Sequence, residues 1–156
     1  DLLADLEQAL DNGAQVSLRV PALIPEDYLP DVHNRLMLYK RISSAVDEEA
    51  LKDLQVEMID RFGLLPEPAK NLFAQASLKL RADRLGILKI DAGAQGGRLE
   101  FSSDTPVDPM QLIKLIQSQP QRYKFEGATV FRFNVPMDTT SERFAMLDAL
   151  LDQLAS

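Results

Sequence analysis

The sequence predicts an α+β fold, with a helical hairpin and a third helix followed by a small, mainly antiparallel sheet that the last helices cover. In the first half, apolar residues recur every three or four positions, which is the spacing of amphipathic helices. In the second half, short alternating apolar and polar runs flank glycine-rich turns, which is typical of β-hairpins. We expect about six helices and five strands in total.

The composition is that of a globular domain. A chain of 156 residues, 46% of them hydrophobic and 26% charged, is long enough to bury a substantial core. No apolar run reaches the length that a membrane span needs. The chain has no cysteine, which excludes disulfides and thiolate metal ligands and favours a reducing, cytoplasmic compartment.

The charge balance argues against a domain that binds duplex DNA by itself. Lys and Arg number 17 and Asp and Glu 24, so the net charge is −7, whereas DNA binding usually needs a basic surface. Residues 79–98 are locally basic. The cations of this stretch, which outnumber Asp83 and Asp91, are Lys79, Arg81, Arg84, Lys89 and Arg98. We interpret it as a solvated helix end and loop, with contact to nucleic acid as the alternative.

The N-terminus indicates a fragment of a longer protein. Asp1 is not an initiator methionine, and neither a basic nor an apolar leader segment follows it. Residues 1–13 are expected to form a helix, ended by Asn12-Gly13, that can belong to a preceding region. Residues 14–156 are expected to form one C-terminal domain, which begins with a strand over residues 16–20.

Residues 28–63 predict two antiparallel helices joined by a short connection. The apolar stripe of the first helix is Leu29, Val32, Leu36, Tyr39 and Ile42, and that of the second is Leu51, Leu54, Met58 and Phe62. Pro30 suits the first turn of the first helix, and Asp47 suits the N-cap of the second. Gly63 suits the position just after a helix, where a left-handed backbone is common.

A third helix is expected from Pro66-Glu67-Pro68 to Leu85-Gly86-Ile87, because Gly86 can end it in a left-handed conformation. Its apolar stripe is Ala69, Leu72, Phe73, Ala76 and Leu80.

Two hairpins and two helices are expected in the second half. One hairpin pairs residues 87–90 with 98–101 around a loose glycine-rich loop, and the other joins residues 122–126 to 131–135. Asp108 and Pro109 predict the start of a short helix, whose stripe is Leu112, Ile113 and Ile116. Thr139 and Glu142 match the capping box of a last helix, whose stripe is Phe144, Leu147, Leu151 and Leu154.

No arrangement typical of catalysis is found. His33 is the only histidine, and with no cysteine it cannot form a histidine-rich or mixed zinc site. The glycines of residues 92–97 lack a following Lys-Ser or Lys-Thr and precede a predicted strand, so they indicate a hairpin tip rather than a phosphate loop. We therefore expect no enzymatic activity, cofactor or metal in this chain.

The end of the second hairpin helix carries an unusual set of charges. Glu57, Asp60 and Arg61 are spaced to share one face, away from Leu54 and Met58. Carboxylates are disfavoured there because the carbonyl end of a helix is negative. Two interpretations remain open: an internal Glu57–Arg61 pair, or a docking surface for a basic patch on a partner.

Three stretches resemble the C-terminal domain of bacterial transcription-repair coupling factors. They are Leu23-Ile24-Pro25-Glu26-Asp27-Tyr28-Leu29-Pro30-Asp31-Val32, Arg35-Leu36-x-Leu38-Tyr39-Lys40-Arg41-Ile42 and Glu57-x-Ile59-Asp60-Arg61-Phe62-Gly63-Leu64-Leu65-Pro66. The resemblance runs from about residue 16 to the end and is strongest over residues 23–87.

The resemblance implies a regulatory domain without ATPase motifs. In this family the full-length protein is an ATP-dependent DNA translocase that removes stalled RNA polymerase and recruits UvrA through a UvrB-like module. The C-terminal domain docks on that module, masks the UvrA-binding surface and restrains the motor, whose own domains bind ATP and Mg²⁺ and contact DNA. The docking residues of the family carry over to Glu57, Asp60 and Arg61. A module that contacts DNA or RNA polymerase directly is the alternative function.

Overall fold

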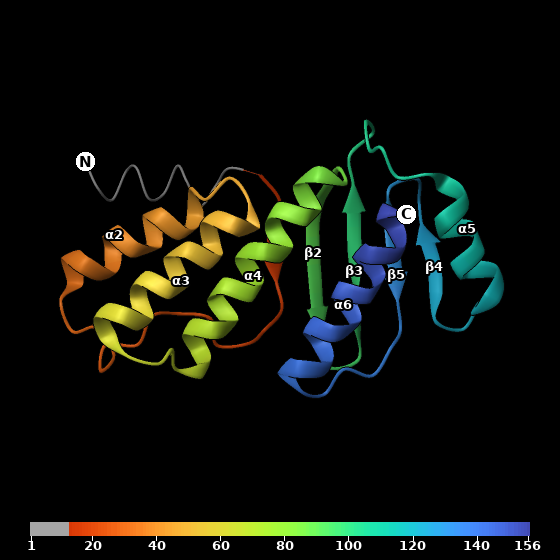
Figure 1. The fold of residues 1–156 in the computed structure, drawn as a ribbon. Helices are drawn as coiled ribbons and strands as arrows, with labels where there is room; N and C mark the ends of the chain where they lie inside the picture. Colours follow the sequence, from red (N-terminus) through yellow and green to blue (C-terminus); the bar gives the residue numbers. More distant parts are fainter. Residues whose placement is uncertain (1–12) are drawn as a thin grey trace. The chain divides into compact units, whose positions relative to one another are not determined.

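The computed structural model describes residues 13–156, so the helix expected over residues 1–13 lies outside the described part except for Gly13 (Figure 1). The described residues form five helices and five strands, and they fall into two compact units. The first comprises Val20–Leu80, and the second comprises Gly13–Arg19 together with Arg81–Ser156. The α+β class and the order of its elements are confirmed, whereas the single domain over residues 14–156 stays a prediction.

The first unit is a helical hairpin with a third helix beside it. Its helices are α2 (Val32–Ser43), α3 (Glu48–Phe62) and the first part of α4 (Glu67–Arg84). Asp47 caps α3 as predicted, because its carboxylate accepts a hydrogen bond from the amide of Ala50 at 2.8 Å. The predicted start of α2 was wrong: Pro30 precedes the helix, and Asp31 is its N-cap and accepts a bond from the amide of His33.

One apolar core holds these three helices together. Its members are Ile24, Leu29, Leu38, Ile42, Leu51, Leu54, Met58, Leu65, Ala69 and Phe73. The predicted stripes of α3 and α4 are largely confirmed. The stripe of α2 was partly wrong, because Val32 is exposed at the first position of the helix and Leu38, which the stripe omitted, is buried.

The second unit is built on a five-stranded sheet with the strand order β1-β2-β3-β5-β4. The strands are β1 (Gln15–Ser17), β2 (Ile87–Gly93), β3 (Gly96–Phe101), β4 (Tyr123–Glu126) and β5 (Val130–Phe133). Only β1 is parallel to its neighbour; the other pairs are antiparallel, as expected. The loop between β2 and β3 was expected to be loose, but Gly93 pairs with Gly96 and leaves a two-residue turn.

Helices α5 (Pro109–Ser118) and α6 (Thr140–Ala155) complete this unit, and α6 runs across the sheet in Figure 1. The capping box between Thr139 and Glu142 is present as predicted. The buried residues of the two helices include Leu115 and Leu150, which the predicted stripes omitted. On the sheet, Phe131 and Phe133 are fully buried, so one face of the sheet supplies the core and the other is left to polar residues.

A buried arginine joins the two ends of this unit's sequence. Arg143 of α6 is 8% exposed and donates to the carbonyls of Leu18 at 2.9 Å, Met137 at 2.9 Å and Asp138 at 3.2 Å. A weaker contact reaches the carbonyl of Arg19 at 3.4 Å. Burying a charge is costly unless it is well hydrogen-bonded, and these carbonyls satisfy the guanidinium.

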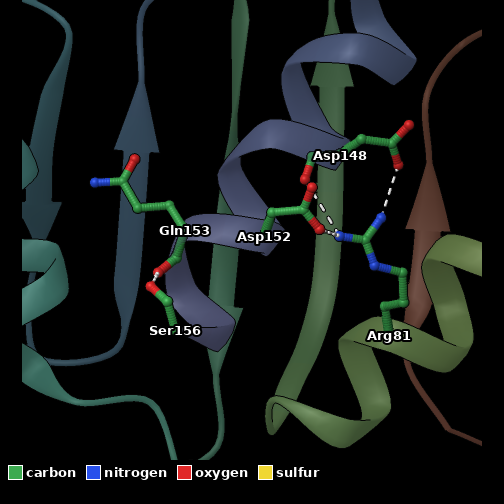
Figure 2. A network of polar contacts seen from close by, with 5 residues as sticks. All are labelled: Arg81, Asp148, Asp152, Gln153 and Ser156. Carbon is green, nitrogen blue, oxygen red and sulfur yellow. Dashed lines mark hydrogen bonds and ion pairs between the residues drawn. The ribbon is translucent and has the colours of Figure 1, made fainter.

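Figure 2 shows a second arginine, Arg81, which binds two carboxylates of α6. Arg81, near the end of α4, donates to the carboxylates of Asp148 at 2.8 Å and Asp152 at 2.5 Å, both on α6. At the end of α6, the Ser156 hydroxyl donates to the carbonyl of Gln153 at 2.7 Å. No helix among the described residues has the length and apolar character needed to cross a membrane.

Candidate docking surface

The predicted charge cluster lies on the last turns of α3, and Glu57 is at its centre. Glu57 accepts two hydrogen bonds from the guanidinium of Arg41, at 2.5 and 3.0 Å. Arg61 lies 3.5 Å from the same carboxylate. The internal Glu57–Arg61 pair is therefore present, but Arg41 of α2 is the closer partner. The sequence gave no indication of it, because the two residues are 16 positions apart on different helices.

The surrounding arginines favour the ionised form of Glu57. The hydrogen bond from Arg41 is the main reason that the pKa of Glu57 lies below its usual value, and Coulomb attraction to Arg41 and Arg61 acts in the same direction. The same hydrogen bond raises the pKa of Arg41. Glu57 therefore stays ionised near neutral pH, and its side chain is still 38% exposed to solvent.

Asp60 differs from Glu57 because it stays outside this network. It is exposed, and no hydrogen bond or ion pair joins its side chain to another residue in the range 13–156. An unpaired carboxylate so close to the carbonyl end of a helix gains nothing from local electrostatics. It is therefore available to a cation outside the described chain.

The end of α3 is held rigidly beneath these charges. Gly63 adopts φ = 95°, in the positive region that favours glycine, and caps the helix through its amide, as predicted. Tyr28 donates its hydroxyl hydrogen toward the carbonyl of Gly63 at 2.8 Å and toward that of Met58 at 3.2 Å. Its ring packs edge-on against Phe62, and Arg61 lies over the Phe62 ring at 4.8 Å. The charges thus project from a fixed helix end.

Exposed apolar residues that were not predicted to take part in docking border the same helix end. Val56 is 54% exposed, Ile59 38% and Leu64 85%. Val56 and Ile59 precede Asp60 on α3, and Leu64 follows its cap. Scattered exposed apolar residues are common, but several of them beside a charged cluster are typical of a protein–protein contact. The helical periodicity could have identified Val56 and Ile59 as exposed, since neither belongs to the buried stripe of α3. We define these three residues with Glu57, Asp60 and Arg61 as the α3 surface.

The other candidate features of the sequence do not lie together. His33 is exposed at the start of α2. The basic residues between 79 and 98 are dispersed: Arg81 is paired with α6, whereas Arg98 lies on a strand of the sheet. Among residues 13–156, no group of three or more acidic or histidine side chains is placed to hold a metal ion.

Comparison with known proteins identifies the family. The TRCF domain family matches residues 18–112 of the chain. The transcription-repair-coupling factor of Haemophilus influenzae is 44% identical over 151 residues, which are 97% of this chain and 13% of that protein. The chain belongs to the transcription-repair-coupling factor family.

Other members extend this result. The transcription-repair-coupling factor of Escherichia coli is 46% identical over 128 residues, or 82% of this chain and 11% of that protein. The chain thus spans about an eighth of the length of these relatives. A crystal structure of the C-terminal domain of transcription-repair coupling factor has the same fold, with a TM-score of 0.78, 20% identity and 92% coverage of both chains.

Proposed function

We propose that this chain is the regulatory docking domain of a transcription-repair coupling factor and that its α3 surface binds a UvrB-like module of the same longer protein. Docked there, the domain masks the surface that UvrA binds and restrains the DNA translocase, in transcription-coupled nucleotide excision repair. ATP and Mg²⁺ belong to the motor domains of the longer protein. The chain itself then needs no catalytic group, because its role is to bind the UvrB-like module and to cover the surface that UvrA binds.

The state of Asp60 is the observation that carries this proposal. It is an exposed carboxylate with no partner among the described residues, at the negative end of a helix whose geometry is fixed by Gly63 and Tyr28. The carboxylate of Glu57 is already paired with Arg41 and Arg61, so it can orient a partner without a large desolvation cost. Exposed Val56, Ile59 and Leu64 supply apolar area beside these charges.

Titration calorimetry of the chain against the purified UvrB-like module tests this proposal. Asp60→Arg places a cation where the module is expected to present one, so binding should weaken by about 1–3 kcal/mol. The matched control is Asp104→Arg, which makes the same charge change at an exposed loop residue of the second unit and should bind like the wild type. Equal affinities for both variants would contradict the α3 surface as the docking site.

The full-length protein gives a second measurement. If docking closes the protein by a few kcal/mol, the UvrA surface is hidden most of the time. Asp60→Arg should then tighten UvrA binding and raise ATP turnover in the absence of polymerase. Unchanged affinity and turnover, with an unchanged thermal midpoint, would mean that Asp60 is an ordinary solvated residue.

Direct contact with DNA or RNA polymerase is the alternative function. The dispersal of the basic residues between 79 and 98, and the net charge of −7, count against it. Binding to phosphates falls steeply with salt, so we expect at most weak binding of duplex DNA at physiological salt. Submicromolar binding under those conditions would favour the alternative.

A further inference from the structure

The outward face of the sheet in the second unit carries a row of like charges. Opposite residues on neighbouring strands share a face, and Arg98 of β3, Arg132 of β5 and Lys124 of β4 are directly opposite one another. Their face is the one away from the buried Phe131 and Phe133. Like charges in direct opposition destabilise a sheet, and the carboxylate of Glu126 offsets part of this repulsion, because Arg132, Lys124 and Arg98 all attract it.

A hollow adjoins this row at the tip of the β2–β3 hairpin. Its volume is about 570 Å³, and the side chains of Arg19, Asp91, Arg98 and Arg132 line it. Gly93 and Gly96 also line it, opposite each other on the two strands, and bring no side chain to fill it. Gly96 has φ = 144°, and a Cβ there would overlap the carbonyl oxygen of Phe133, so this position requires glycine.

Arg19 is held at the hollow in an uncommon backbone conformation. It is the only non-glycine residue with positive φ among residues 13–156, at 57°. The buried Arg143 contacts the carbonyls of Leu18 and Arg19 and so supports this conformation. The Arg19 guanidinium lies beside Gly93, where a Cβ would stand 3.0 Å from its Nη1. Its side chain is 68% exposed, and its contact with Asp91 is long, at 3.4 Å.

The three arginines of the hollow are unequally paired. Arg132 is bound to Glu126, with Nη2 to Oε2 at 2.9 Å and Nε to Oε1 at 2.8 Å. Its Nε–H is poorly directed at that oxygen and is left as a buried donor without a hydrogen bond. Arg98, between Asp91 and Arg132, has no ion pair with another described residue. The hollow thus contains Arg98, which has no ion pair with another described residue, and two arginines, Arg19 and Arg132, that each keep N–H donors without a hydrogen bond.

We propose that this hollow binds the carboxylates of an acidic segment of a partner protein, with Arg98 as the central ligand and Arg19 and Arg132 at its sides. Arginine binds carboxylates through two parallel hydrogen bonds, and three guanidinium groups around one hollow suit that chemistry. Together with Asp91, they give the lining a net charge of +2, from three cations and one anion, on a chain whose net charge is −7.

A protein segment fits this face better than a nucleic acid does. Single-stranded nucleic acids bind to faces that offer aromatic rings for stacking as well as cations. The outward-facing positions of β2 to β5 at residues 89, 91, 98, 100, 124, 126, 130 and 132 include no aromatic residue. They do include Asp91, Glu100 and Glu126, which would repel a continuous row of phosphates but leave space for isolated carboxylates.

Nuclear magnetic resonance titration of the 156-residue chain tests the proposal. The probe is the octapeptide Gly-Ser-Glu-Asp-Glu-Glu-Ser-Gly, compared with the same peptide carrying Gln and Asn in place of Glu and Asp. We expect the acidic peptide alone to shift the amides of residues 92–98 and 132–134. Arg98→Glu should lower its affinity roughly tenfold or more. Lys114→Glu, which makes the same charge change at an exposed residue of α5, should leave affinity near that of the wild type.

A second variant and two further ligands complete the test. Arg19→Gly removes the side chain but keeps a residue that tolerates positive φ, so the fold should persist while peptide binding weakens. Inorganic phosphate and a single-stranded deoxythymidine oligonucleotide are titrated in parallel. The proposal is overturned if the amide peptide binds as well as the acidic one, if both charge reversals act alike, or if the oligonucleotide binds more tightly than the peptide.

Discussion

The two units of this chain use the same kinds of charged group in opposite ways. In the helical unit, a carboxylate lies between two arginines: Glu57 is bound by Arg41 and Arg61. In the sheet unit, an arginine lies between two carboxylates: Arg81 is bound by Asp148 and Asp152. The first set connects residues at most 16 positions apart, whereas the second spans 67 and 71 positions.

The difference shows which charges are needed for the fold. The helical unit closes through an apolar core within one stretch of about sixty residues, so its charges remain on the surface. The sheet unit consists of two separate stretches of the sequence. Two of its arginines, Arg81 and Arg143, form hydrogen bonds with segments that are far away along the chain. Arg143 is the extreme case, since it reaches the carbonyl of Leu18 across 125 positions. The charges of the α3 surface are therefore expected to affect binding, whereas Arg81 and Arg143 of the sheet unit are expected to affect stability.

The largest effect is expected from a core truncation in the helical unit. Met58 is fully buried, so Met58→Ala should cost about 3–4 kcal/mol in the free energy of unfolding, from lost apolar contact and the cavity left behind. Val56→Ala, on the exposed side of the same helix, is the control and should change stability by about 0.5 kcal/mol or less. Urea unfolding measures both. In Met58→Ala, amide hydrogen exchange should rise most within residues 20–80. An equal rise in both units would contradict the division of the chain into two units.

The next effect is that of the buried arginine in the sheet unit. Arg143→Leu leaves the carbonyls of Leu18 and Met137 without donors and should cost about 2–3 kcal/mol. Arg143→Lys restores a charge but fewer directed donors, so an intermediate value is expected. Hydrogen exchange of β1 and of the segment before α6 provides the local measurement. A variant as stable as the wild type would show that the guanidinium is not needed to join the two ends.

A smaller effect is expected from the arginine between two carboxylates. Arg81→Ala removes two ion pairs whose carboxylates are 54% and 76% exposed, so we expect a loss of about 1 kcal/mol. At this chain length that corresponds to about 2–4 °C in the thermal midpoint. Because exposed ion pairs are screened by salt, the difference from the wild type should shrink at high ionic strength. A difference that does not depend on salt would assign the loss to packing.

The smallest effect concerns the pH dependence of Glu57. Its pKa is lowered in the folded state, so the carboxylate contributes stability above its unfolded pKa, and this contribution is lost as the pH falls through the folded pKa. The wild type should therefore exceed Glu57→Gln slightly in thermal midpoint at neutral pH, and the two should converge once the pH falls below the lowered pKa of Glu57 in the folded state. Glu126→Gln is the matched control in the sheet unit, since Arg132 lowers the pKa of Glu126 in the same way. If the difference in thermal midpoint between the wild type and Glu57→Gln grew as the pH fell, the predicted pH dependence would be wrong.

Local sequence determined most of the elements and their ends. The caps at Asp47 and Asp108 and the capping box at Thr139 depend on side chains within three residues of the amide they bind, and the amide of Gly63 donates to the carbonyl of Ile59 four residues earlier. Contacts of this short range are visible in the sequence. The stripes of α3 and α6 were predicted for the same reason. Two predictions failed: Val32 is exposed rather than part of the buried stripe of α2, and Gly93 pairs with Gly96 in a tight turn rather than a loose loop.

What the sequence determined by itself is therefore the order and type of the elements, the family, and the three charged residues on α3. Only the tertiary structure decided which charges meet. It gave Glu57 its partner Arg41, left Asp60 unpaired, and placed Arg98 opposite Arg132 beside a hollow. The physical reason is the sequence separation over which each interaction acts. Helix caps and helical periodicity involve residues a few positions apart, whereas ion pairs between elements and sheet registers depend on distances that only the folded backbone sets.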